Sequence, residues 1–368
     1  MWSVNPTALS GLAPCIDREM THVKLPDPER LAARILRRER AAVADGLNLL
    51  DNKLAEARDR AVRLLACLSG ERWLKDGHLV GVTGPPGAGK SSLVSAMIRE
   101  WRHAGRTVGV LAVDPSSRPE LGGGALLGDR IRIKNSSYDE GLFIRSLANR
   151  NQLGGVATEV WPMSCLMLAC FDIVVIETVG VGQTEIDIAD IGDTVCYVAQ
   201  PASGDTIQYL KSGIIEIPDI FAVNKCDLGP PARKTASEIG RSAPRQDRRE
   251  DWDYPVCLVS ATMNTGIKEF HDHFDRHRKF LADTGLLGKL RTRHQSAWVI
   301  RLLKEEFGTI GLELAGGRAS IEARLGEDPS DQFGEYERLR KHLLSRFLSV
   351  NQPTNPTKEE HPDEQAIV

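Results

Sequence analysis

A glycine-rich segment at residues 84–91 carries the clearest chemical signal in the sequence. It is GPPGAGKS, which fits the pattern G-x-x-x-x-G-K-[ST]. An apolar run precedes it at 79–83, and a helical pattern follows at 92–101. Glycines let backbone N–H groups point at an anion, and a helix beginning there adds its positive end. We therefore predict a phosphate-binding loop made by Gly84, Gly87, Ala88, Gly89, Lys90, Ser91 and Ser92.

Two residues of this loop have distinct expected roles. Lys90 would contact the β- and γ-phosphates of a nucleotide, and the Ser91 hydroxyl would bind Mg²⁺. Two carboxylates at strand ends could join them, because Asp114 ends the run 107–113 and Glu177 ends the run 172–176. Mg²⁺ prefers oxygen ligands and usually keeps several waters. A single strand-end carboxylate is as often a helix cap or a solvated residue, but two together favour a magnesium site with catalytic roles for Lys90, Asp114 and Glu177.

The segment NKCD at 224–227 indicates which base is bound. Guanine presents a ring N–H and a 2-amino group side by side, and one carboxylate can accept both hydrogens; adenine lacks this edge. Asp227 is the predicted reader, Asn224 would brace the loop, and the Lys225 stem would pack on the base. The next strand ends at Ser260-Ala261, where a backbone N–H could meet the guanine carbonyl oxygen. The four-residue match gains weight from its place after a strand and downstream of a phosphate loop.

The segment ETVG at 177–180 stands where a phosphate-sensing D-x-x-G is expected. The Gly180 amide could sense the γ-phosphate, but Val181 follows it, so no glutamine is there to orient water. We therefore predict slow intrinsic hydrolysis and a switch whose rate a partner sets. The loops 118–129 and 200–211 could order around the γ-phosphate, or be ordinary loops.

Apolar strand-like runs alternate with helical stretches from residue 79 onward. This alternation predicts an α/β fold with a doubly wound, mostly parallel sheet, whose ligands lie at the carboxyl ends of the strands. The expected strands are 79–83, 107–113, 131–134, 172–176, 194–199, 220–224 and 256–260.

Helical patterns flank this region on both sides. Two helices are expected within 28–69 and three at 267–282, 286–307 and 333–349. The resulting division is 1–75 for an N-terminal arm and helical extension, 76–282 for the nucleotide-binding domain, 283–350 for a C-terminal helical arm and 351–368 for a disordered tail.

Composition excludes several classes of protein. The 368 residues are 41% hydrophobic with a net charge of −3, so the chain is globular and has no global basic field for nucleic acid or anionic membrane. The longest apolar run, 165–176, contains Asp172 and is too short to cross a bilayer. The N-terminus shows no secretory signal, and the seven cysteines are scattered as in a reduced protein. These features predict a cytoplasmic protein.

Several longer motifs together resemble the MeaB/ArgK-type G proteins, P-loop GTPases related to nickel-inserting metallochaperones. The resemblance covers about 28 to 310 and is carried by GPPGAGKSS (84–92), VDPSS (113–117), LGDRIRI (127–133), ETVGVGQTE (177–185), SGD (203–205) and NKCD (224–227). It implies a GTPase that binds GTP/GDP and Mg²⁺ and acts as a chaperone of an adenosylcobalamin-dependent acyl-CoA mutase, such as methylmalonyl-CoA mutase. It also implies a homodimer in contact through the C-terminal helical arm.

The same resemblance assigns roles to three further residues. Asp129 joins the acidic residues around Mg²⁺ and its waters, and the loop from Asp205 to Lys211 matches an extra switch that communicates with the mutase. The chain departs from the family pattern around 118–121, at Asn151 and at Gln200-Pro201. We expect these departures to affect partner contacts and switch timing rather than GTP binding.

Two other functions compete with this interpretation. A metal-insertion GTPase would need His271, His273 and His277 as metal ligands, although a polar helix face is the simpler explanation of these residues. A transport-associated ATPase or kinase would use ATP, which the guanine motif at 224–227 argues against.

Overall fold

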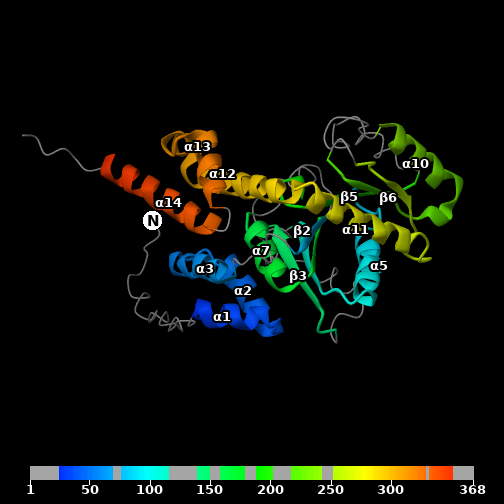
Figure 1. The fold of residues 1–368 in the computed structure, drawn as a ribbon, viewed down its shortest axis with the longest axis horizontal. Helices are drawn as coiled ribbons and strands as arrows, with labels where there is room; N and C mark the ends of the chain where they lie inside the picture. Colours follow the sequence, from blue (N-terminus) through cyan, green and yellow to red (C-terminus); the bar gives the residue numbers. More distant parts are fainter. Residues whose placement is uncertain are drawn as a thin grey trace, which may run out of the picture.

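The computed structural model describes residues 25–68, 76–115, 139–149, 158–178, 188–201, 217–242, 252–328 and 331–350. Its described strands form one seven-stranded sheet in the order β3-β2-β4-β1-β5-β6-β7, and all pairings between these strands are parallel (Figure 1). The strands are β1 His78–Thr83, β2 Val108–Pro115, β3 Leu142–Asn149, β4 Ile173–Thr178, β5 Thr194–Ala199, β6 Ile220–Val223 and β7 Val256–Leu258. The predicted doubly wound α/β fold is confirmed.

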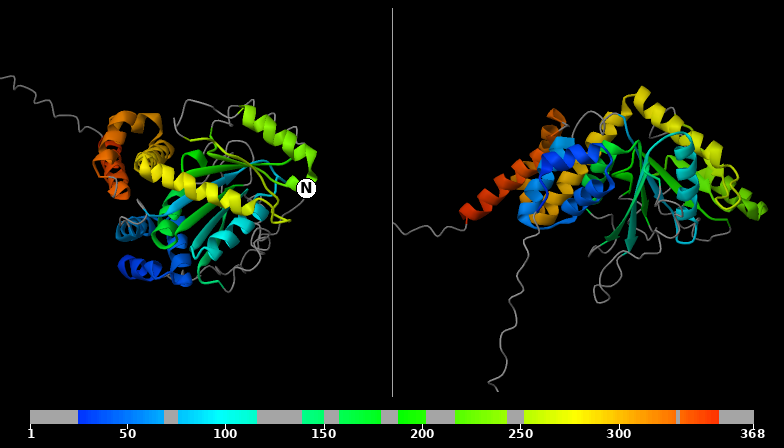
Figure 2. Two further views of the ribbon diagram at one scale, coloured as in Figure 1. Left: turned by 45° about the vertical axis from the view of Figure 1, so that its right-hand side comes forward. Right: turned by 90° about the horizontal axis from the view of Figure 1, so that it is seen from below.

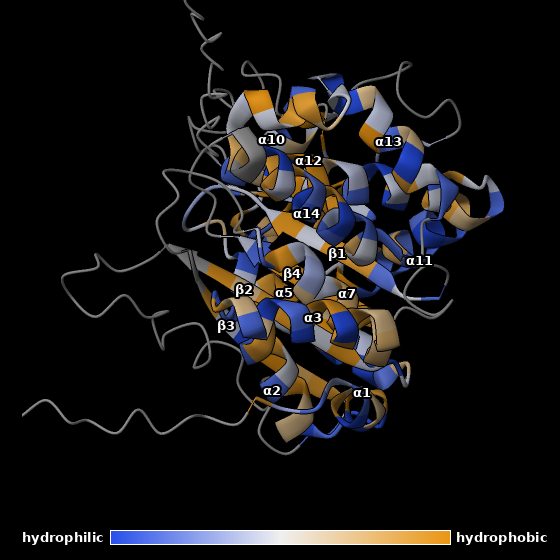
Figure 3. Cartoon of the chain, turned by 90° about the vertical axis from the view of Figure 1, so that its left-hand side faces the viewer, coloured by the Kyte–Doolittle hydropathy of each residue, from blue (hydrophilic) through white to orange (hydrophobic). Residues whose placement is uncertain are grey.

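Helices cover both faces of the sheet (Figure 2). The helices α5 (Lys90–His103) and α11 (Ile267–Asp283) pack on one face, and α7 (Val160–Cys170) and α10 (Pro230–Ser242) pack on the other. Strands β1, β4, β5 and β6 are buried along their whole length, which is why they appear in the sequence as nearly continuous apolar runs. Figure 3 shows this apolar centre in orange.

Three helices precede the sheet, where two were predicted. They are α1 (Pro28–Leu36), α2 (Arg40–Asp51) and α3 (Ala55–Leu68). The Arg30 N–H donates to the Asp27 carboxylate at 2.9 Å, so Asp27 caps α1. Arg38 takes a left-handed conformation, with φ of 60°, and separates α1 from α2. The three helices bury their apolar faces against α7, whose residues are all buried because it lies between them and the sheet.

The C-terminal helices extend away from the sheet (Figure 1). The long helix α12 (Leu286–Leu314) contains a non-helical residue, Gly308, and leads to α13 (Gly317–Glu327) and α14 (Gln332–Val350). An apolar cluster that includes Val299, Ile321 and Leu339 holds the three together. Helix α13 was not predicted, because it is short and the glycines at 316, 317 and 326 obscure its period.

One strand of the sheet was not predicted, and one predicted strand is not tested by the structure. The strand that pairs with β2 at the sheet edge is β3, whereas the expected strand at 131–134 lies outside the described residues. The predicted arm and tail, 1–24 and 351–368, also lie outside them. In the part of the chain that the structure describes, no helix is long and apolar enough to span a membrane.

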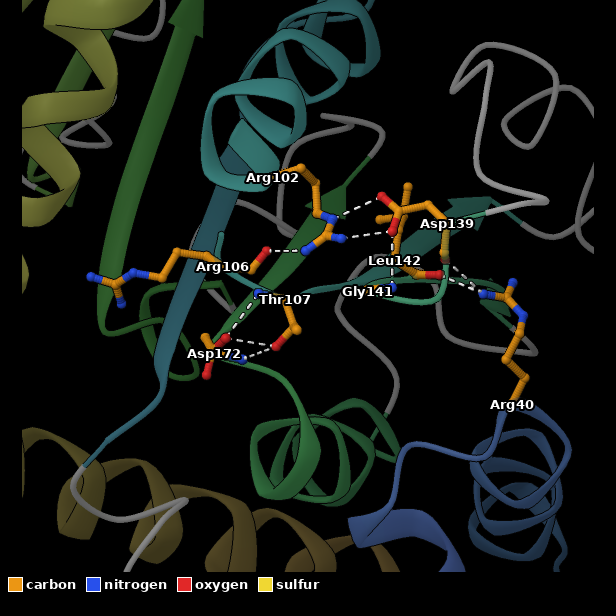
Figure 4. Close-up of polar contacts among 8 residues, drawn as sticks. All are labelled: Arg40, Arg102, Arg106, Thr107, Asp139, Gly141, Leu142 and Asp172. Carbon is orange, nitrogen blue, oxygen red and sulfur yellow. Dashed lines mark hydrogen bonds and ion pairs between the residues drawn. The ribbon is translucent and has the colours of Figure 1, made fainter. Parts of the chain in front are cut away.

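A polar cluster holds the start of β3 (Figure 4). Arg102 Nε and Nη2, at the end of α5, each donate to the Asp139 carboxylate at 2.7 Å, and Gly141 N–H donates to the same carboxylate at 2.9 Å. Arg40 Nη1, at the start of α2, donates to the Leu142 carbonyl at 2.6 Å. The edge strand is thereby tied to both the phosphate-loop helix and the N-terminal helices.

Candidate functional site

The glycine-rich loop connects β1 to α5, as its sequence predicts. Gly84, Gly87 and Gly89 have φ of 137°, 78° and 86°, a region that favours glycine. A Cβ on Gly84 would lie 2.2 Å from the Val198 carbonyl oxygen of β5, so glycine is also needed for this close approach. Helix α5 begins at Lys90, directly after the loop, and its first-turn N–H groups point into it.

The ammonium group of Lys90 is held over the loop. Its Nζ donates to the carbonyls of Gly84 at 2.7 Å and Pro85 at 3.1 Å, and the residue is 7% exposed. A cation is thus fixed beside the loop at the start of α5. This arrangement suits a polyanion such as a triphosphate.

Two oxygen donors from different elements meet beside Lys90. The hydroxyl of Ser91, on α5, donates to Glu177 Oε1 at 2.5 Å, and Glu177 lies near the end of β4, paired in register with Val82 of β1. Such hard oxygen donors fit Mg²⁺. Asp114 lies at the same edge of the sheet, on β2, but its side chain is outside what the structure describes.

Two segments are predicted to bind the base, one beginning at Asn224 and the other at Ser260, and we call them the base loops. The Asn224 side chain joins them to the phosphate loop. Its Nδ2 donates to the carbonyls of Ala88 at 2.9 Å and Gly89 at 3.4 Å, and its Oδ1 accepts from the Ala261 N–H at 3.2 Å. Asn224 is 3% exposed. A Cβ on Gly89 would lie 2.4 Å from Asn224 Nδ2, so the glycine leaves room for this contact. Three segments far apart in the sequence therefore meet at one side chain.

Lys225 makes a second connection to the phosphate loop. It has a left-handed φ of 59° at the start of the short helix η3 (Cys226–Leu228). Its Nζ donates to the Gly87 carbonyl at 2.8 Å and to Gln200 Oε1 at 3.2 Å. Sequence reasoning missed Gln200 here; its position at the end of strand 194–199 was the available signal.

Asp227 is held by the neighbouring strand end. The Ser260 hydroxyl donates to Asp227 Oδ1 at 2.6 Å and accepts from the Met263 N–H at 3.2 Å. Ser260 is buried, whereas Asp227 is exposed. The Asp227 carboxylate is therefore accessible, and its hydrogen bond to Ser260 holds it in position. Burial, aided by the charge of Asp227, raises the pKa of the neighbouring Cys226 thiol.

The remaining predicted site residues are only partly covered by the structure. Ser92 lies on α5 with its side chain exposed. Asp129, Gly180, Asp205 and Lys211 lie outside the described residues. The structure thus brings together the phosphate-loop residues, Ser91 with Glu177, and the base-loop residues Asn224, Lys225, Asp227, Ser260 and Ala261.

The three histidines considered as metal ligands have separate surroundings. His277 is fully buried, with Nδ1 2.7 Å from Thr194 Oγ1, whereas His273 Nδ1 lies 2.6 Å from Arg276 Nη2. Among the described residues, no group of three or more His, Cys, Asp or Glu is placed to hold a metal ion.

The fold and this edge of the sheet define a P-loop GTPase-like protein. The family model described as "Methylmalonyl Co-A mutase-associated GTPase MeaB" matches residues 43–310. The chain therefore belongs to the MeaB family of GTPases.

Named relatives agree with this assignment. A Pyrococcus abyssi protein named as a candidate GTPase is 39% identical, over 88% of this chain and 99% of the relative. The Mus musculus protein named "Methylmalonic aciduria type A homolog, mitochondrial" is 34% identical, over 75% of this chain and 69% of the relative.

A solved structure supports the fold. A crystal structure titled "LAO/AO transport system kinase" matches with a TM-score of 0.61 at 22% identity, over 88% of this chain and 97% of that one.

Proposed function

We propose that this chain binds GTP and GDP at the carboxyl edge of its sheet and hydrolyses GTP slowly. The observation that carries the proposal is the Asn224 side chain, which bonds to the phosphate loop on one side and to the Ala261 backbone on the other. A ligand with phosphates at one end and a base at the other would span these segments. GTP fits both the span and the family of the chain.

The phosphates would lie against the loop from Gly84 to Ser92. Lys90 would exchange its present carbonyl partners for the β- and γ-phosphate oxygens. Ser91, Glu177, Asp114 and Asp129 would hold Mg²⁺ directly or through water, and the bound ion would neutralise phosphate charge. The Gly180 amide would sense the γ-phosphate.

The base would be read by Asp227. Its carboxylate would accept the guanine ring N–H and 2-amino group, and Ser260 would keep it oriented through their 2.6 Å hydrogen bond. The Ala261 N–H would meet the guanine carbonyl oxygen, and the Lys225 stem would cover one face of the base.

Hydrolysis would be slow without a partner. Water attacks the γ-phosphorus, the bond to the bridging oxygen breaks, and GDP and phosphate leave. Lys90 would stabilise the negative charge that develops, as would the Mg²⁺ that Asp114 and Glu177 help to hold. The chain has Val181 where a water-orienting glutamine would stand. A partner that completes the site would set the rate.

We propose an adenosylcobalamin-dependent acyl-CoA mutase as this partner. The family description supports this, because it names methylmalonyl-CoA mutase. The chain would assist cofactor loading, protection or reactivation of the mutase, with Asp205 to Lys211 as the switch facing it. It would act in the cytoplasm as a homodimer through residues 283–350, beside a GTPase domain at 76–282 and an extension at 1–75.

A base-swap experiment tests the nucleotide assignment. Asp227→Asn should weaken GTP binding at least tenfold and gain binding of xanthosine triphosphate, because xanthine has a carbonyl where guanine has the 2-amino group. Lys90→Ala should abolish hydrolysis. Exposed residues on α11 give matched controls, Asp275→Asn and Lys268→Ala, which should behave as wild type. Unchanged GTP selectivity in Asp227→Asn would refute its role.

A second experiment tests the client. GTP turnover is measured alone and with a panel of adenosylcobalamin-dependent acyl-CoA mutases, with ATP as control. Acceleration by one mutase would identify the partner. No acceleration by any of them would contradict the chaperone role while leaving nucleotide binding intact.

A further inference from the structure

The end of β5 forms the floor of the phosphate loop. The Val198 carbonyl lies so close to Gly84 that no Cβ fits between them, and the Ala199 carbonyl accepts the Asn224 N–H at 2.9 Å. The backbone that leads into the next residue, Gln200, is therefore held in place between the phosphate loop and the base loop at Asn224.

The backbone at Gln200 is constrained on its other side too. Pro201 follows it and is buried. A residue before proline is steered away from the helical region, which continues the extended direction of the strand. The half-buried Gln200 side chain thus leaves β5 in a restricted direction, and its Oε1 lies 3.9 Å from where a Cβ on Gly87 would be.

The Gln200 side chain accepts a hydrogen bond from Lys225, a residue predicted to contact the nucleotide. Lys225 Nζ donates both to Gln200 Oε1 at 3.2 Å and to the Gly87 carbonyl at 2.8 Å. The ammonium group is therefore shared by the tip of the phosphate loop and the end of β5. A hydrogen bond to a charged group is worth more than one between neutral groups.

We propose that Gln200 is a positioning residue that fixes Lys225 on the phosphate loop and thereby slows the release of guanine nucleotides. This inference rests on the proposed function. It revises our expectation from sequence that Gln200-Pro201 bears on partner contacts rather than on GTP binding. Gln200 would act through Lys225, because its Oε1 accepts a hydrogen bond from Lys225 Nζ.

The test is a double-mutant cycle on dissociation of a fluorescent GDP analogue. Gln200→Met keeps the length of the side chain and removes the acceptor, and Lys225→Met removes the donor. We expect Gln200→Met to raise the dissociation rate roughly tenfold in the wild-type background. In the Lys225→Met background it should change the rate less than about twofold, because the effect passes through Lys225.

A second readout separates positioning from base recognition. The preference for GDP over IDP, which lacks the 2-amino group, should be the same in Gln200→Met and wild type. Equal effects in both backgrounds, no effect in either, or a changed GDP/IDP ratio would overturn the proposal. Failure of the wild-type chain to bind GDP would refute the proposed function itself, so the two failures are distinct.

Discussion

The two ends of the same parallel sheet are built in opposite ways. At the carboxyl end, side chains such as Lys90 and Asn224 bond to loop carbonyls, and Asp227 faces outward. At the amino end, charged groups are buried and bond to one another. Arg291 Nε and Nη2 donate to the Asp193 carboxylate at 2.9 and 2.6 Å, and both residues are nearly inaccessible.

The amino end continues as a buried chain of polar groups. Thr194 Oγ1 lies 2.7 Å from both His78 Nε2 and His277 Nδ1, and His277 Nε2 lies 3.6 Å from Asp219 Oδ1. Trp252 covers the His277 ring, with centroids 4.5 Å apart. These contacts fix α11 and α12 to the starts of β1, β5 and β6.

The difference separates two uses of polar side chains in one fold. Groups that satisfy one another away from water hold the helices in place, and losing one leaves a buried partner unsatisfied. Side chains that hydrogen-bond to loop carbonyls instead fix the shape of the loops that would bind a ligand. Substitutions at the amino end should therefore change stability, and substitutions at the carboxyl end should change nucleotide binding.

The largest expected effect is on the buried ion pair. Arg291→Met should lower the free energy of unfolding by about 3–5 kcal/mol, because it leaves the Asp193 carboxylate buried and unpaired. Urea unfolding measures this. The double variant Arg291→Met, Asp193→Leu should recover part of the loss. A loss below about 1 kcal/mol in the single variant would show that the pair does not hold this edge.

The next effect is the pH dependence of stability. Burial lowers the pKa of both His78 and His294 to about 3. Below pH 6.5 the unfolded chain therefore binds protons at these histidines that the folded chain does not bind. The free energy of unfolding is thus highest above pH 6.5 and falls as the pH drops toward 3. The two histidines together should cost roughly 2.5 kcal/mol between pH 7 and 5.5.

Urea unfolding at both pH values measures this loss. His294→Gln should remove about half of it. The same pH dependence in the variant would contradict the buried neutral state of His294.

A smaller effect is expected where the carboxyl end itself contains a buried polar group. Asn224→Ala should lower the free energy of unfolding by about 1 kcal/mol but weaken GDP binding roughly tenfold or more, because it releases Ala88 and Ala261 together. Calorimetric binding and urea unfolding of the same sample separate the two. A loss of about 3 kcal/mol in the free energy of unfolding, with unchanged GDP affinity, would contradict the distinction between the two ends.

The smallest effect concerns the half-exposed part of the amino end shown in Figure 4. Arg102→Met removes both hydrogen bonds to Asp139, whose side chain is 31% exposed. The loss should be about 0.5–1 kcal/mol, because solvent screens such pairs, with no change in GDP affinity. A loss of unfolding free energy as large as that of Arg291→Met would show that burial does not determine how much such an ion pair stabilises the fold.

The sequence predicts the carboxyl end far better than the amino end. Its motifs at 84–91 and 224–227 are short and continuous in sequence. In the first, a loop that binds phosphate needs glycines at fixed spacing. The order of β1, β2 and β4 to β7 along the chain also follows from apolar runs, although individual bounds differ by one or two residues.

Other features could not be predicted from local patterns. The Asp193–Arg291 pair joins residues 98 positions apart, and each alone resembles a surface charge. Helix α7 is apolar all round and gives no helical period. Strand β3 contains Arg145, Ser146 and Asn149, which weaken its strand signal, and Gln200 has meaning only once β5 lies beneath the phosphate loop.

The length of α12 has a mechanical consequence. Arg291 fastens this helix near its first turn, and the segment runs unbroken until Gly308, where φ is 67°. At 1.5 Å per residue, the stretch between them is a rod of about 25 Å. The rod is fastened a second time within its length, where Trp298 Nε1 donates to the Thr158 carbonyl at 2.9 Å. A movement at the starts of β1 and β5 would therefore reach α13 and α14 as a shift of the whole rod rather than as a rotation about Arg291.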